Sequence, residues 1–282
     1  MIKITKLADK NQFLHLFINP IRLKIMKQLI ISLLCYLLIS ASFAQKNPAA
    51  AGFDEVGSDA KAIEIADQVM DAMGGRKNWD KTRYIAWNFF GARKLLWDKW
   101  TGNVRVDNLN NDQTILININ TDKGRVFKYG QEQTAADSLI KYMRAGKGAW
   151  INDGYWLTMP FKLKDSGVTI KYLGEEKTQD GAEADLLQLT FKGVGNTPDN
   201  KYKVWVNKTN HLVWQWAYYP KYDAEKPGFI RPWIDYKKQG KILLSGERGD
   251  RDLTDIMVFD KLPETLFTDF KRPDLSQYLQ AK

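Results

Sequence analysis

Side chains of the kinds that most often perform catalysis are scarce in this chain. Cys35 is the one cysteine, and His211 is the single histidine after residue 44. A nucleophile–histidine pair or triad would therefore need His211 as its base. His211 lies at the tip of an expected hairpin, which is a poor place to hold a base in one geometry. We expect no catalytic role for it.

The sequence also contains no motif for binding a metal ion or a nucleotide. A zinc site built from histidine and cysteine needs more of these residues than the chain contains after residue 44. The sequence has no EF-hand loop, no Gly-x-Ser-x-Gly elbow and no glycine-rich phosphate loop. We predict no cofactor, no metal and no enzymatic activity.

Carboxylates keep one enzymatic alternative open. Glycoside hydrolysis needs two carboxyl groups that the fold brings together, and spacing in sequence does not reveal such a pair. Tryptophans that neighbour acids, around Trp97–Trp100 and Trp233–Asp235, would suit stacking on sugar rings. A carboxylate-based, carbohydrate-active envelope hydrolase is therefore the alternative to a non-enzymatic protein.

The most distinctive feature of the composition is a set of ten tryptophans, all of which follow residue 44. Each indole buries about 150–250 Å², so leaving it in water is costly. Most are expected to pack a large β core. However, strands such as Leu186–Leu189 and Leu212–Tyr219 are apolar on both faces, whereas a one-sided sheet has polar residues on its outer face. This pattern indicates an interior groove in which a ligand covers several aromatic side chains.

Two meanders of antiparallel strands are expected to position these residues. The first begins at Tyr84 and the second runs from Val168 to Phe259, with turns too short for parallel crossovers. A helix capped by Asp59 and ended by Gly74-Gly75 precedes them.

The two meanders are joined by a different kind of sequence. A helix is expected over about 134–145, followed by an aromatic crossover, Trp150–Val168, in which Pro160 and Gly167 stop regular structure. Pro263–Phe270 is expected to dock as a tail. Together the elements predict one mainly β (α+β) domain of about a dozen strands with two or three helices.

Residues 1–44 have the pattern of an extension followed by a secretory signal peptide. Lys24 and Lys27 precede an apolar run, Leu29–Ile39, that is shorter than the ~20 residues of a spanning helix. Small residues before Gln45 predict cleavage after Ala44, and Met26 is the expected true start. Residues 45–59 are expected to be a flexible leader to a single domain over 60–282. The protein is therefore predicted to be periplasmic or otherwise secreted to the cell envelope.

Charge argues against a nucleic-acid partner. The formal net charge is +9, but residues 1–44 alone carry six Lys/Arg against one acid. The remaining excess is small and forms no block, whereas nucleic-acid binding needs a concentrated basic surface. We expect a monomer that binds no nucleic acid and makes at most peripheral contact with a membrane.

Several short motifs resemble a family of secreted bacterial proteins of unknown function related to the LolA/LolB-like periplasmic lipoprotein carriers. The motifs are Met73-Gly74-Gly75 with Trp79, Tyr155-Trp156-Leu157, Met159–Asp165 with Gly167-Val168, Gly195, Thr197-Pro198 and Tyr202, and Trp233 with Asp235-Tyr236. The resemblance implies an open, strongly curved antiparallel half-barrel with helices on its concave side and an apolar groove for acyl chains.

Strand parity and this resemblance together select candidate ligand-binding residues. The groove predicts a non-enzymatic binder of a lipid, an acyl chain or a lipid-modified partner. A third possibility is a structural or partner-binding β domain with a filled interior and no ligand cavity. The seven predicted lining residues are Trp87, Phe89, Trp97, Trp156, Phe161, Trp214 and Trp216.

Overall fold

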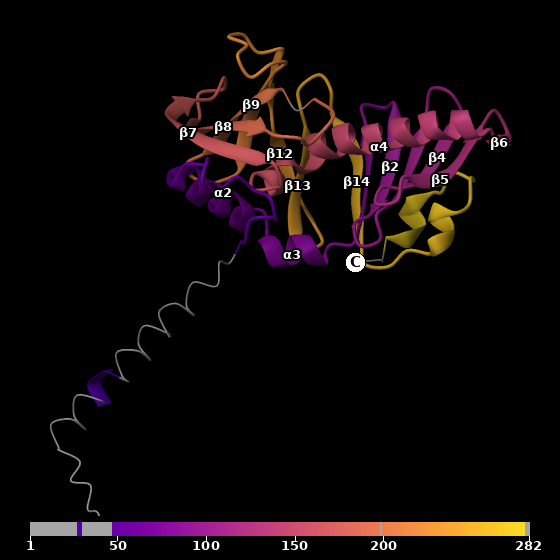
Figure 1. Cartoon of the computed structure of the whole chain (residues 1–282), viewed down its shortest axis with the longest axis horizontal. Helices are drawn as coiled ribbons and strands as arrows, with labels where there is room; N and C mark the ends of the chain where they lie inside the picture. Colours follow the sequence, from indigo (N-terminus) through magenta and orange to yellow (C-terminus); the bar gives the residue numbers. More distant parts are fainter. Residues whose placement is uncertain (1–26, 30–46, 198, 280–282) are drawn as a thin grey trace, which may run out of the picture. The chain divides into compact units, whose positions relative to one another are not determined.

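The computed structural model describes residues 27–29, 47–197 and 199–279. The chain divides into two compact units, Met1–Lys46 and Asn47–Lys282. In the first unit the described residues, Lys27–Leu29, are helical. The rest of the predicted signal peptide, its cleavage site after Ala44 and the extension before Met26 lie outside the described residues. The second unit contains all the sheets and helices that Figure 1 labels.

The first meander forms a seven-stranded antiparallel sheet, closed on one side by the last strand of the chain. Hairpins join β1 to β6 in order, and β14 pairs with β1 from Tyr84↔Phe259 to Phe89↔Leu253. In β1, β3 and β4, alternate residues point into the main core, whereas β6 contributes none. The strands are β1 (Tyr84–Phe89), β2 (Arg93–Asp98), β3 (Asn103–Asn108), β4 (Gln113–Asn118), β5 (Lys123–Lys128), β6 (Gln131–Gln133) and β14 (Leu253–Phe259).

The second meander continues the same surface with a five-stranded and a two-stranded sheet. The Trp233 amide donates to the Trp214 carbonyl at 2.9 Å, which joins the two smaller sheets, and β13 packs beside β14. Among the described residues these strands do not close into a barrel, so the expected open, curved antiparallel fold is confirmed. The strands are β7 (Val168–Lys177), β8 (Glu183–Phe191), β9 (Lys201–Asn207), β10 (Val213–Tyr219), β11 (Phe229–Pro232), β12 (Ile234–Gln239) and β13 (Ile242–Glu247).

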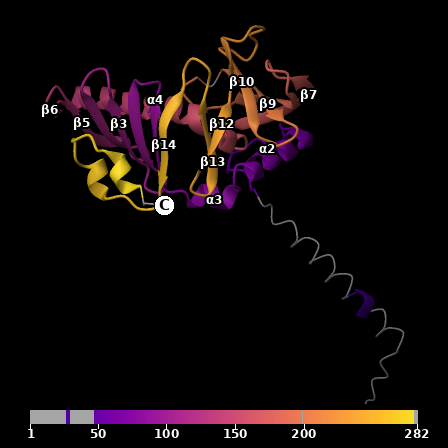
Figure 2. The same ribbon diagram turned by 180° about the vertical axis from the view of Figure 1, so that it is seen from behind.

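Three helices accompany the sheets. Helix α2 (Ala60–Ala72) packs against β7, and α3 (Arg76–Lys81) leads into β1. The long helix α4 (Ala136–Thr158) crosses β3, β4 and β5, and Figures 1 and 2 show it along one side of the seven-stranded sheet. A 3₁₀ turn, η1 (Met159–Lys162), follows it directly.

The expected boundary between a helix ending near residue 145 and an aromatic crossover is wrong. Helix α4 continues through Trp150 to Thr158, and Pro160 then lies in η1. Gly146 and Gly148 argue locally against a helix, since glycine costs about 1 kcal/mol in a helix. Packing outweighs that cost here, because a Cβ at Gly146 would lie 2.8 Å from Ile115 Cγ2. Gly146 lets the helix approach β4 closely.

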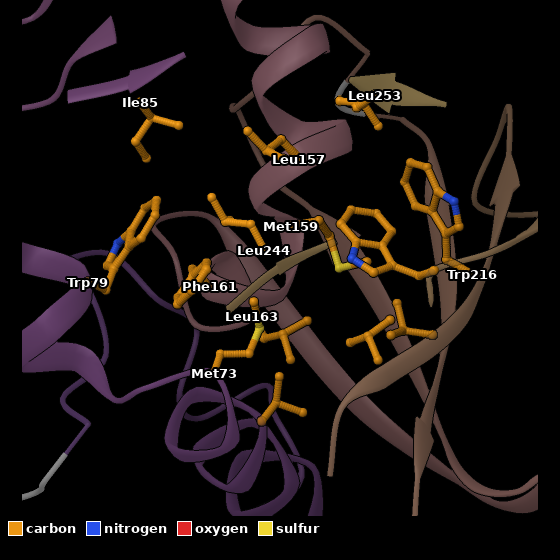
Figure 3. Packing of buried hydrophobic residues seen from close by; sticks show 14 of the residues in the cluster. Met73, Trp79, Ile85, Leu157, Met159, Phe161, Leu163, Trp216, Leu244 and Leu253 are labelled. Atoms are coloured by element: carbon orange, nitrogen blue, oxygen red, sulfur yellow. The ribbon is translucent and has the colours of Figure 1, made fainter. Parts of the chain in front are cut away.

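The main core lies between the inner faces of the sheets and the helices. Figure 3 shows Leu157, Met159, Phe161 and Leu163 running through its centre, with Trp79 on one side and Trp216 on the other. Burial of these side chains ties the end of α4 and η1 to both meanders at once, which fixes the position of the helix across the sheet.

The outer face of the seven-stranded sheet is covered by the C-terminal segment, residues 260–279. Tyr84, Ala86 and Leu96 form a small apolar cluster there with Phe259 and Leu266. The segment contains two 3₁₀ turns, η2 (Glu264–Phe267) and η3 (Leu275–Tyr278). The predicted docking of Pro263–Phe270 is therefore confirmed.

The five-stranded sheet also has apolar residues on its outer face. Ala184, Leu186, Trp205, Ala217 and Tyr219 form a separate buried cluster there. The two-faced apolar pattern of β8 and β10, from which a groove was inferred, thus reflects an outer cluster as well as the inner core. That pattern alone does not indicate a ligand site.

Residues 47–59, for which composition predicts a flexible leader, are hydrogen-bonded to the domain. The amides of Asp54 and Asp59 donate to the carbonyls of Val168 and Ile170, both at 3.0 Å. The Asn47 side chain bonds to the Asp67 carbonyl at 3.2 Å and to the Asp71 carboxylate at 2.8 Å. This stretch therefore runs alongside strand β7.

Candidate functional site

A pocket of about 390 Å³ opens on the inner side of the sheet, between the C-terminal half of α4 and the β8–β9 loop. The turn after η1 and the start of β7 complete its wall. Its lining is mainly apolar and aromatic, with Trp97, Trp150, Ile151, Tyr155, Trp156, Val168, Phe191, Val194 and Tyr202 among the side chains.

Helix α4 positions most of the aromatic wall. Trp150 lies edge-on to Trp97 of β2, with ring centroids 5.3 Å apart, and Tyr155 contacts Tyr202 of β9 at 5.4 Å. The helix therefore bridges the two meanders at the pocket. The β8–β9 loop is attached to the helix by Asn196, whose side-chain amide donates to the Gly148 carbonyl at 3.0 Å.

Charge at the pocket is limited to one pair at its edge. Among the described residues that line it, Lys162 and Asp165 are the charged side chains, and they bond to each other. Burial raises the pKa of the Tyr155 hydroxyl well above its ordinary value and also raises the pKa of Tyr202. Both phenols are therefore protonated and neutral at physiological pH.

Four residues of the pocket wall carry buried polar atoms that lack a hydrogen-bond partner within the described part of the chain. They are Nε1 of Trp97, Nε1 of Trp150, the Tyr155 hydroxyl and Oδ1 of Asn200. A buried polar group without a partner costs about 1–3 kcal/mol. All four atoms are covered by protein, so each would have to turn toward the pocket before it could bond to a ligand.

The seven predicted lining residues divide between the pocket, the core and the outside. Trp97 and Trp156 line the pocket. Trp87, Phe89, Phe161 and Trp216 are buried in the core, where Phe161 stacks on Trp79 at 4.2 Å and Trp216 lies edge-on to Trp156 at 4.8 Å. Ligand binding by any of the seven stays a prediction.

Trp214 lies apart from the other six because of a β-bulge. It is the extra residue in β10, where Val213 pairs with Val206 and Gln215 pairs with Trp205. Its indole Nε1 donates to Asp180 in the β7–β8 turn at 2.8 Å. The bulge changes the strand parity, so Trp214 and Trp216 do not share a face although they are two residues apart.

Sequence reasoning missed the pocket residues Trp150, Tyr155, Phe191 and Tyr202. Trp150 and Tyr155 lie on one side of α4 with the pocket residues Ile151, Gly154 and Thr158, and this shared side becomes visible only once the helix is known to continue to residue 158. Phe191 and Tyr202 flank a loop whose path the sequence does not reveal.

His211 lies outside the pocket wall, and the described residues contain no cluster of candidate metal ligands. His211 adopts φ 57° in the β9–β10 turn, where its amide donates to the Asn207 carbonyl at 2.9 Å, and it is not among the residues of the pocket wall. Over residues 27–29, 47–197 and 199–279, no three His, Cys, Asp or Glu side chains gather in a way that could hold a metal ion.

A buried arginine, Arg248, holds the end of α4 beside the pocket. Arg248 is fully buried and donates from Nη2 to the carbonyls of Trp156 and Ser245, at 2.9 and 3.0 Å, while its guanidinium lies 3.6 Å from the Trp233 ring centroid. Burial lowers the pKa of this guanidinium to about 9. The contact to the Trp156 carbonyl fixes the last turn of α4, which carries two of the aromatic wall residues.

The described part of the chain has no helix with the length and apolarity that crossing a membrane requires. No protein-family model matches the chain, and no curated protein matches it.

Solved structures show a limited likeness to this chain. A DUF1329 family protein from Desulfovibrio piger is 14% identical with a TM-score of 0.41, over 73% of this chain and 96% of that one. A LolA superfamily protein from Nitrosomonas europaea is 13% identical with a TM-score of 0.37, over 74% and 97%. An uncharacterized conserved protein from Thermus thermophilus is 11% identical with a TM-score of 0.24, over 76% and 94%. The likeness concerns the fold alone.

Proposed function

We propose that this protein is a non-enzymatic binder of a lipid, an acyl chain or a lipid-modified partner in the periplasm or elsewhere in the cell envelope. The supporting observation is the pocket between α4 and the β8–β9 loop. Its volume of about 390 Å³ lies within the range of small-molecule sites, roughly 300–1,000 Å³, and its wall is aromatic. An apolar chain of modest length matches both properties.

The chemistry of the wall supports binding of an apolar tail with a neutral polar group. Burial of an acyl chain contributes about 0.8 kcal/mol per CH₂, part of which offsets the lost freedom of the ligand. Nε1 of Trp97, Nε1 of Trp150 and the Tyr155 hydroxyl are buried without a partner, and a side-chain shift that turns one of them toward the pocket would let it donate to an ester or hydroxyl oxygen. The pairing of Lys162 with Asp165 leaves no unbalanced charge in the described wall.

The two alternatives receive less support. A carboxylate hydrolase needs two carboxyl groups, and among the described residues of the pocket wall Asp165 is the one acid and is paired with Lys162. A β domain with a filled interior would leave the pocket and its unpartnered polar atoms without a role.

Titration with a fluorescent long-chain fatty acid tests the proposal. Ile151→Trp places an indole in the pocket wall and should weaken binding at least tenfold. Ile140→Trp, the same change at an exposed position of the same helix that is not in the pocket wall, is the matched control and should leave the affinity unchanged. Equal affinities for both variants, or no binding by the unaltered protein, would refute the proposal.

A further inference from the structure

Trp100, in the turn between β2 and β3, is the most exposed of the ten tryptophans. It is 60% exposed, whereas the other nine are buried or half-buried. Of the tryptophans whose acidic neighbours suit sugar stacking, Trp233 is fully buried and Trp97 lies in the pocket wall. Leaving an indole in water forgoes the stabilisation that burial of its apolar surface gives. The exposed position of Trp100 therefore calls for a role outside the core.

The Trp100 indole is nevertheless held in one orientation. Its Nε1 donates to the Asp80 carbonyl near the end of α3 at 3.1 Å, and the Arg83 guanidinium lies over the ring with Cζ 5.1 Å from the centroid. The Trp100 amide donates to the Asp98 carboxylate at 3.0 Å. These contacts fix one edge and one face of the ring, so the exposed surface belongs to its other face and its remaining edge.

Arg83 is fixed in turn by a buried carboxylate. Asp98 is 3% exposed and accepts from Arg83 Nε at 3.2 Å and from Nη2 at 2.9 Å. The Lys99 amide donates to the Arg83 carbonyl at 2.9 Å, which holds the two chain segments together. Fixing a mobile surface side chain costs conformational entropy. An indole that is already fixed binds a flat ligand with little further loss of entropy.

Polar groups with free hydrogen-bonding capacity adjoin the turn that carries Trp100. The β4–β5 turn packs against it, because Asn120 Nδ2 donates to the Thr101 carbonyl at 3.2 Å and the Ile119 amide donates to the Gly102 carbonyl at 2.9 Å. Asn120 is exposed, and its Oδ1 accepts no hydrogen bond within the described part of the chain. Thr101 is exposed as well. A hydroxyl donor and an amide acceptor are therefore available at this end of the sheet.

The three charged residues that contact Trp100 are paired. Arg83 bonds to Asp98 at 2.9 Å, and Asp80 bonds to Arg76 at 2.8 Å. An anionic ligand is bound by cations that are free to neutralise it, so a neutral ligand matches these paired charges better. One exposed ring among polar groups is also a small apolar area for a protein interface, which buries about 800 Å² on each partner. The contacts favour a small, neutral ligand with one flat apolar face.

We propose that this surface binds a neutral pyranose ring of a glycan. A pyranose has a face of C–H groups that stacks on an indole, and a rim of hydroxyl groups that bonds to side chains such as Thr101 and Asn120. The inference goes beyond the proposed function, since Trp100 is not in the pocket wall. We define the surface as the Trp100 platform, which consists of Asp80, Arg83, Asp98, Trp100, Thr101 and Asn120.

Oligosaccharide titration followed by the indole N–H resonances in ¹⁵N NMR spectra tests this inference. The probes are maltotetraose and cellotetraose, which are neutral glucans, and chitotetraose, which carries N-acetyl groups. At least one probe should shift the Trp100 resonance at roughly 10 mM, a concentration that detects a site with a Kd of about 1 mM. The probe that binds distinguishes a glucan from an N-acetylated glycan. No shift of this resonance with any of the three probes would overturn the inference.

Substitutions then locate the sugar. Trp100→Ala removes the stacking surface and should weaken binding at least about tenfold, as measured by saturation-transfer NMR on the sugar. Tyr222→Ala is the matched control, because it removes an aromatic ring that is 67% exposed in the β10–β11 loop, and it should bind as the unaltered protein does. Equal weakening in both variants would contradict the platform. Circular dichroism checks that both variants stay folded.

Fatty-acid titration separates this inference from the proposed function. Trp100→Ala should keep the affinity of the unaltered protein for the fatty acid, because Trp100 does not line the pocket. Oligosaccharide binding without fatty-acid binding would reject the proposed function and support the Trp100 platform. Fatty-acid binding without oligosaccharide binding would do the reverse.

Discussion

The two faces of the seven-stranded sheet are covered in different ways. On the inner face, α4 and η1 pack by apolar and aromatic contacts, and one ion pair joins Arg93 of β2 to the fully buried Asp153 of α4 at 2.7 Å. This cover leaves a mainly apolar pocket at its end.

On the outer face, the C-terminal segment is held mainly by one side chain. Arg105 of β3 is 1% exposed and donates to the carbonyls of Leu266, Asp269, Phe270 and Lys271 at 2.6 to 3.2 Å. Its Nε donates to Asp107 at 2.7 Å, so all five N–H groups are used.

The two covers therefore differ in function: the inner face keeps a cavity that can bind a ligand, whereas the polar groups of the outer face are bonded to the C-terminal segment. A second cavity, of about 510 Å³, lies beneath the C-terminal segment, but Lys94, Arg105, Asp107, Asp255, Arg272 and Asp274 are in its wall. On the inner face, apolar packing leaves a cavity that an apolar ligand can fill. On the outer face, Arg105 bonds to backbone carbonyls of the C-terminal segment and so holds that segment in place.

The largest expected effect comes from the outer face. Arg105→Met removes five hydrogen bonds and leaves Asp107 buried without its cation, so the free energy of unfolding should fall by about 3–5 kcal/mol. Guanidinium unfolding monitored by circular dichroism measures the loss. A loss no larger than that of an exposed arginine would contradict the role assigned to Arg105.

The matching test on the inner face depends on pH. Burial already raises the pKa of Asp153 despite its bond to Arg93, and a raised pKa means that stability is lost as pH rises through that value. Arg93→Met removes the opposing cation and should cost about 3 kcal/mol at pH 7, and less near pH 4, where Asp153 can take up a proton. Unfolding at the two pH values measures the difference; an equal cost at both would show that Asp153 is not the affected group.

The next test compares two predicted ligand residues, one in the pocket wall and one outside it. Trp97→Leu removes part of the pocket wall and should weaken fatty-acid binding by about tenfold, that is by about 1.4 kcal/mol. Trp214→Leu, away from the pocket, should leave the affinity unchanged. Fluorescence titration measures both, and equal losses would place the ligand elsewhere.

The smallest change in the free energy of unfolding is expected at the edge of the C-terminal segment, where Arg125 contacts it. Arg125 is about half exposed, pairs with Glu132 and donates to the Thr268 carbonyl at 2.7 Å. Arg125→Met should cost no more than about 1 kcal/mol, since exposed ion pairs contribute little. Denaturant unfolding checks this value, and a loss similar to that of Arg105→Met would remove the contrast between a buried and an exposed arginine.

The elements with a clear local period could be predicted from the sequence. Helix α2, the antiparallel meanders and the docked tail follow from apolar spacing and turn residues. The extension of α4 past residue 145 could not, because Gly146 argues locally against a helix and is explained only by the approach to Ile115.

The candidate site was less accessible to sequence reasoning. Parity places residues correctly only while a strand is regular, and the bulge at Trp214 ends that regularity. Arg105 gave no signal in the sequence, since its partners are backbone carbonyls, which every residue carries. Contacts between a side chain and distant backbone depend on the complete fold.

Arg105 also has a consequence for the order in which the molecule assembles. Its carbonyl partners follow it in the sequence by 161 to 166 residues, and β1 and its neighbour β14 are separated by a similar length of chain. Contacts of such high sequence separation slow folding, because a long loop must close before they form. Until those contacts form, the outer apolar residues of the first meander are uncovered, and water is the hydrogen-bond partner of the Arg105 terminal nitrogens. α4 covers the inner face of that sheet early, but its β1 edge and its outer face are completed only by residues 253–279, and a chain truncated before them would lack this cover.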